Sequence, residues 1–66
     1  MNEQQIHSVK QIIEARLLQW CESDENFDRL LAYNDCTRDY EDEENVKRLI
    51  DLYYEIFTDD VSYILD

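Results

Sequence analysis

Apolar residues recur at every third or fourth position through the first third of the chain, which is the spacing of one helical face. This spacing predicts a helix over residues 3–22. Its core stripe consists of Ile6, Val9, Ile13, Leu17 and Trp20, with Ile12 and Cys21 at the borders. Asn2 is placed to cap the first turn, which contains Glu3. Leu18 lies off the stripe, and Arg16 lies within it, so we expect the Arg16 guanidinium to extend past the core edge.

A second, shorter helix is predicted over residues 24–34. Ser23 is a favourable N-cap, and two acids follow it in the first turn, where the helix dipole stabilises negative charge. Helical spacing is kept by Phe27, Leu30, Leu31 and Asn34. Asn34 and Asp35 both tolerate a left-handed backbone, so this helix should stop there.

Residues 35–42 are open to two interpretations. Either Thr37 or Asp39 caps a helix that starts early, or the segment is a loop. The pattern is clear again over residues 43–57, where the apolar stripe consists of Val46, Leu49, Ile50, Tyr53 and Phe57. Acids also precede bases by four residues in this helix, the favourable order for ion pairs, between Glu43 and Lys47 and between Glu44 and Arg48.

A polar cluster ends this third helix, and a last apolar group fits a short terminal helix. The cluster is Thr58, Asp59 and Asp60, and the apolar group is Val61, Ile64 and Leu65. The predicted fold is therefore all-α, a small bundle of three helices plus a short C-terminal helix, in a single domain over residues 1–66. The chain contains no Gly and no Pro. Because tight hairpin turns depend on Gly, this composition disfavours an all-β fold.

The third predicted helix is apolar over more of its circumference than one packing face needs. The stripe is extended on one side by Leu52 and Ile56 and on the other by Tyr54. One interpretation is a central helix contacted on two sides. The other is an apolar interface for self-association, which would give a homodimer, or for a different partner. A chain of 66 residues buries little core, and dimerisation would relieve that shortage.

Charge adds the strongest functional indication. The chain carries 17 acids and 6 bases, for a formal net charge of −11. Residues 23–44 contain nine of those acids and two bases. Such a chain is disfavoured as a direct ligand of nucleic acid or of an anionic membrane, because both require a basic patch. No membrane span or signal peptide is expected either, since charged residues interrupt the first 20 positions.

Crowding the acids costs folding free energy through mutual repulsion, which suggests a gain in binding. Carboxylates four residues apart on a helix lie ~6 Å apart along its axis, so a bundle can display an anionic row comparable to that of a duplex. Tyr40 stands among the acids and is expected to stack on an arginine or aromatic group of the partner. The candidate partner-binding residues are Asp24, Glu25, Asp28, Asp35, Asp39, Tyr40, Glu41, Asp42, Glu43 and Glu44.

Residues suited to metal binding or catalysis are few. Alternating oxygen ligands from Asp35 to Glu41 resemble the start of a calcium-binding EF-hand loop, but Tyr40 stands where Gly is needed and Val46 where the bidentate Glu is needed. The only histidine, His7, is expected on a helix flank, and no Cys/His set has zinc spacing. We therefore predict no metal, no cofactor and no catalytic residue, and the small size argues against an enzyme.

In size, charge and helicity the chain is similar to phage anti-CRISPR and anti-restriction proteins, to bacteriocin immunity proteins and to small acidic adaptors. The leading hypothesis is an inhibitor of phage or mobile-element type that mimics nucleic-acid charge and blocks a basic nucleic-acid-binding protein. The alternatives are a non-inhibitory adaptor or regulator and a toxin immunity protein. If Cys21 and Cys36 are both reduced, they favour the cytoplasm. The alternative is a disulfide bond between them.

Overall fold

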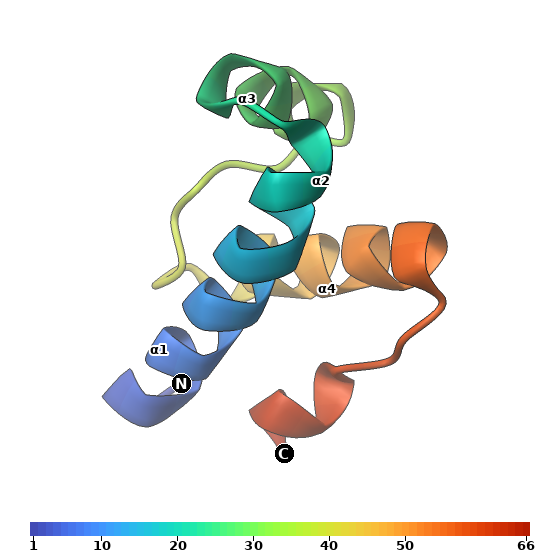
Figure 1. Ribbon diagram of the computed structural model, residues 1–66. Coiled ribbons are helices and arrows are strands. Elements are labelled where there is room, and N and C mark those ends of the chain that lie inside the picture. The colour runs from blue at the N-terminus through green and yellow to red at the C-terminus, as the bar shows by residue number, and fades with distance from the viewer.

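The computed structural model describes all 66 residues and confirms an all-α bundle of three helices followed by a short 3-10 turn (Figure 1). The first helix runs without interruption from Glu3 to Cys21. It consists of α1 (Glu3–Ile12), a π-helical segment (Ile13–Leu18) and α2 (Gln19–Cys21). Asn2 caps it as predicted, and Gln5 completes a reciprocal capping box, because each side chain accepts a hydrogen bond from the other residue's backbone N–H.

The second helix, α3 (Asp24–Tyr33), begins at the predicted cap and crosses the far end of the first helix (Figure 1). The Ser23 hydroxyl accepts the Asn26 backbone N–H at 3.1 Å. The expected stop is confirmed, because Asn34 lies outside the helix and Asp35 adopts a left-handed φ of 56°. The chain then runs as a loop to Asp42, which decides between the two interpretations of residues 35–42.

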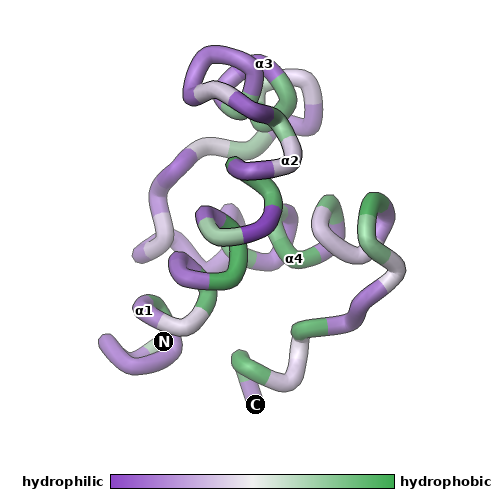
Figure 2. Tube along the Cα trace, viewed as in Figure 1, coloured by the Kyte–Doolittle hydropathy of each residue, from purple (hydrophilic) through white to green (hydrophobic).

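The third helix, α4 (Glu43–Phe57), has the predicted bounds. Its N-cap is Asp42, so neither Thr37 nor Asp39 starts a helix early. It packs against the π-helical segment, while the terminal 3-10 helix (Ser62–Leu65) packs against α1. Hydrophobic and hydrophilic residues alternate along each helix (Figure 2), as this packing requires. Thirteen buried residues form one continuous core, to which all three helices contribute.

The π-helical segment explains an error in the predicted first stripe. Val9, Ile13 and Leu17 are buried as expected, but Trp20 is 56% exposed. A π turn holds more residues than an α turn, so side chains after Leu17 lag behind the 100° spacing. Leu18, expected off the stripe, is consequently half-buried and packs against the core. The wider turn therefore places Leu18, and not Trp20, against the core.

Candidate partner-binding site

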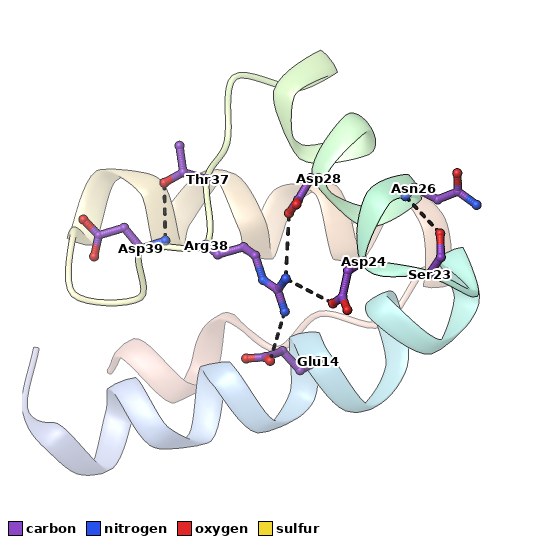
Figure 3. A network of polar contacts seen from close by, with 8 residues as sticks. All are labelled: Glu14, Ser23, Asp24, Asn26, Asp28, Thr37, Arg38 and Asp39. Carbon is purple, nitrogen blue, oxygen red and sulfur yellow. Dashed lines mark hydrogen bonds and ion pairs between the residues drawn. The ribbon is translucent and has the colours of Figure 1, made fainter.

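Arg38, in the loop between α3 and α4, joins acids from two helices (Figure 3). Its guanidinium donates to Asp24 at 3.2 Å and to Glu14 at 3.3 Å, and it pairs with Asp28 at 3.8 Å. The same group lies 5.0 Å from the centre of the Phe27 ring, in cation–π geometry. Partial burial opposes its charge, but the bond to Asp24 and the surrounding carboxylates outweigh this and raise the Arg38 pKa.

These contacts neutralise much of the acidity of α3. Asp24 and Asp28 share Arg38, and Glu25 pairs with Arg29 one turn later. Asp35 has no ion pair, and only its backbone carbonyl accepts a long bond from Arg48, at 3.5 Å. Three of the four predicted partner-binding acids between residues 24 and 35 are thus engaged within the protein.

The remaining acids gather where the loop enters α4. We call this group the acidic corner, and it consists of Asp39, Glu41, Asp42, Glu43 and Glu44. All five residues are exposed. A single ion pair compensates them, between Glu43 and Lys47 at 3.8 Å, whereas the expected pair between Glu44 and Arg48 does not form. The structure therefore concentrates carboxylates that mostly lack ion-pair partners at the N-terminal end of α4.

Local hydrogen bonds fix the backbone of the acidic corner. The Asp39 carboxylate accepts the Glu41 N–H at 3.0 Å, and the Thr37 hydroxyl accepts the Asp39 N–H at 3.3 Å. The Asp42 carboxylate caps α4 by accepting the Glu44 N–H at 3.0 Å. Short polar side chains that bond to nearby backbone stabilise such turns without Gly. The charged groups are therefore presented from a defined backbone.

Asn45 fastens this loop to α4, although it was not among the residues predicted for the site. Its side chain is buried, donates to the carbonyls of Thr37 and Asp39, both at 2.8 Å, and accepts the Thr37 N–H at 2.8 Å. A polar residue four positions before Leu49, within the buried side of the helix, was the available signal. Buried amides of this kind need partners, and a neighbouring loop is the nearest source.

Tyr40 is placed differently from the prediction. We expected it to be exposed and to stack on a partner, but it is 8% exposed and belongs to the core. Its hydroxyl lies close enough to Glu14 and Arg38 to shift its pKa, but it makes no hydrogen bond of good geometry with either. Burial and the negative charge of Glu14 raise the pKa of Tyr40 to about 12. The buried Tyr40 ring therefore anchors the acidic corner to the core and is not available to stack on a partner's side chain.

The predicted apolar interface on α4 is also largely occupied. Leu52 is 5% exposed and sits in the core, and Ile56 is half-buried against it. Only Tyr54, at 53% exposure, presents a free aromatic surface on this helix. The first interpretation of the wide apolar helix is therefore correct for Leu52 and Ile56: they are covered within the protein.

Few groups here are arranged for chemistry. The two cysteines are free, and burial raises the pKa of both Cys21 and Cys36, so neither thiol is activated as a nucleophile. Arg16 donates to the Tyr53 hydroxyl at 2.8 Å and pairs with Asp59 at 3.2 Å, which ties the first helix to the end of α4. No group of three His, Cys, Asp or Glu side chains is placed to hold a metal ion.

None of the helices combines the length and apolar character that crossing a membrane requires. Comparisons with protein-family models, with curated proteins and with solved structures find no match to this chain.

Proposed function

We propose that this protein is a small acidic binding protein that inhibits a basic nucleic-acid-binding protein in the cytoplasm. The acidic corner is the observation that supports this proposal: five exposed carboxylates share one ion pair. Surfaces that bind nucleic acid carry Lys and Arg that neutralise phosphates. A concentrated set of carboxylates is complementary to such a surface and competes with nucleic acid for it.

The fixed backbone of the acidic corner favours tight binding. Asn45 holds the loop from one side and Tyr40 anchors it in the core. A loop that is already ordered loses less conformational entropy when a partner binds, so more of the interaction free energy appears as affinity. Complementary charge also accelerates the encounter, and this acceleration weakens as salt screens it.

The test uses neutral variants that leave the caps intact. Glu41 and Glu44 accept no hydrogen bond through their side chains, so E41Q/E44Q removes two charges from the acidic corner while retaining both Asp turns. The matched control is E3Q/D66N, which removes the same charge from exposed positions elsewhere. Each protein is immobilised and used to capture proteins from a nuclease-treated bacterial host lysate at low and high salt.

Captured proteins are then assayed for binding of labelled nucleic acid, with and without the inhibitor. We expect the wild-type protein and E3Q/D66N to capture a basic nucleic-acid-binding protein at low salt and to displace its nucleic acid. E41Q/E44Q should do so about tenfold more weakly, the change expected for a loss of about 1.4 kcal/mol. Equal capture by both double variants, or capture of no such protein at low salt, contradicts the proposal.

A second candidate function is an adaptor that docks through an aromatic surface. Trp20 is 56% exposed and forms a T-shaped pair with the Phe57 ring at a centroid distance of 6.3 Å. Exposed tryptophans are frequent anchors of protein interfaces. In that case W20A abolishes partner capture at all salt concentrations, whereas E41Q/E44Q leaves it unchanged.

A further inference from the structure

The outer face of α4 presents charges in an order that is complementary to itself. We define this outer face as the five exposed residues Lys47, Arg48, Asp51, Tyr54 and Glu55. Two bases come first, Asp51 lies at the centre, and Tyr54 and Glu55 follow. The opposite side of the helix is buried in the core, so this face is the one α4 offers to another molecule.

Positions on the outer face are symmetric about Asp51. Arg48 and Tyr54 each lie three residues from it, and Lys47 and Glu55 each lie four residues from it. At 1.5 Å per residue these offsets are ~4.5 Å and ~6 Å along the helix axis. When a second α4 is laid antiparallel on the first, with the twofold axis at Asp51, the residues at equal offsets meet.

We propose that the outer face of α4 is the contact surface of a homodimer with two antiparallel α4 helices. Each Lys47 faces the Glu55 of the second copy, and each Arg48 faces its Tyr54, so every contact occurs twice, as a twofold interface requires. Arg48 lies over the exposed tyrosine ring in cation–π geometry. The charge order specifies a second copy of this chain, because a parallel arrangement would set like charges against one another.

A shallow groove provides a place for the tyrosine. It has a volume of about 180 Å³ and is lined by Asn34, Arg48, Asp51, Leu52 and Glu55. Tyr54 of the second copy enters beside Arg48, and its ring lies against the exposed edge of Leu52, the one apolar residue of a mostly polar lining. Tyr54 is 53% exposed in the single chain, so this contact removes apolar surface from water in both copies.

Two repulsive effects oppose the dimer and set the conditions of the test. The two Asp51 carboxylates approach at the axis, each flanked by Arg48 one turn earlier on its own helix. The net charge of −11 on each copy also repels at long range. At about 0.15 M salt the Debye length is about 8 Å, so distant repulsion is screened while direct contacts persist.

The experiment exchanges charges at the two ends of the outer face. In a dimer of K47E, the introduced glutamate faces Glu55, and in a dimer of E55K, the introduced lysine faces Lys47. Each variant alone therefore loses both ion pairs between Lys47 and Glu55. Mixed together, the two variants place opposite charges at both ends again. Sedimentation velocity measures association from about 10 µM to 1 mM protein, the range that suits a weak dimer. The matched controls are E41K and K10E, which make the same charge changes outside this face.

We expect wild-type protein to dimerise, each single variant to associate about tenfold more weakly, and the equimolar mixture to recover at least wild-type association. K47E/E55K, with both charges exchanged, should also dimerise by itself. A monomeric wild-type protein at 1 mM, or a mixture no better than its two components, overturns the proposal. Circular dichroism shows whether each variant folds. Partner capture is a separate outcome only for E55K, because K47E also removes the ion pair between Lys47 and Glu43 of the acidic corner.

Discussion

Replacing Tyr40 with phenylalanine tests how the core holds the acidic corner. The Tyr40 ring is buried, and its hydroxyl has no hydrogen-bond partner. An unsatisfied buried hydroxyl costs about 1–3 kcal/mol of desolvation, and Y40F removes that cost while keeping the ring. We expect the free energy of unfolding of Y40F at pH 7 to rise by about 1 kcal/mol, which raises the midpoint temperature of a domain this small by about 4–8 °C.

The same residue gives the wild-type protein a pH dependence that Y40F lacks. The Tyr40 pKa is about 12 in the folded protein and 10.0 for an ordinary tyrosine. The unfolded chain therefore releases this proton first as pH rises, and the stability due to neutral Tyr40 is complete below pH 10 and lost by about pH 12. Across that window the wild-type protein should lose about 1.4 kcal/mol per pH unit relative to Y40F.

Urea unfolding followed by circular dichroism, at pH values from neutral to about 11, gives both quantities. The difference between the two proteins matters, because every other group is common to both and its contribution cancels. Two results would refute this reasoning. A Y40F protein that is less stable at pH 7 indicates that the hydroxyl makes a favourable bond, and parallel curves above pH 10 indicate that it is hydrated.

Three further predictions concern the loop between α3 and α4 and the residues that hold it in place. N45A leaves two carbonyls and one N–H without partners, so it should destabilise the fold by about 2–4 kcal/mol and speed amide exchange in the loop. N26A, which loses one exposed bond, should cost less than about 1 kcal/mol in the same urea experiment. R38Q should cost about 1–2 kcal/mol at low salt and less at high salt, since its ion pairs are partly exposed, whereas R29Q should cost under about 0.5 kcal/mol. The Cys36 thiol should react with a disulfide reagent only after unfolding, because it is buried and its pKa is raised; equal rates in folded and unfolded protein would contradict this.

Local patterns were sufficient to predict the helices. The caps Asn2 and Ser23, and the stop at Asn34 and Asp35, depend on side chains that bond to backbone a few residues away. Such interactions are encoded within one turn of the sequence, so the bounds of α4 could be read from periodicity alone. The loop over residues 35–42 remained undecided, because its structure depends on Asn45 and on the core beneath it.

Errors arose where the structure departs from regular spacing or depends on distant residues. The π-helical segment turned Trp20 out to solvent and Leu18 against the edge of the core, and nothing in the residue types predicts a wider turn. Tyr40 was assigned to the surface because its sequence neighbours are acidic. Its ring is buried in the core, and its hydroxyl lies beside Glu14 of the first helix, 26 positions earlier in the sequence. The charge of its sequence neighbours does not predict such a contact.

The candidate site shows the same division between local and distant information. Along the sequence, residues 23–44 read as one anionic segment. In the fold, Arg38 returns to α3 and the first helix and neutralises Asp24 and Asp28, fourteen and ten positions earlier. The carboxylates without an ion pair are therefore found mainly at the start of α4, in the acidic corner. Binding should consequently depend on which carboxylates lack a partner within the protein, and the loss of Glu41 or Glu44 should weaken capture more than the loss of Asp24, although each removes one charge.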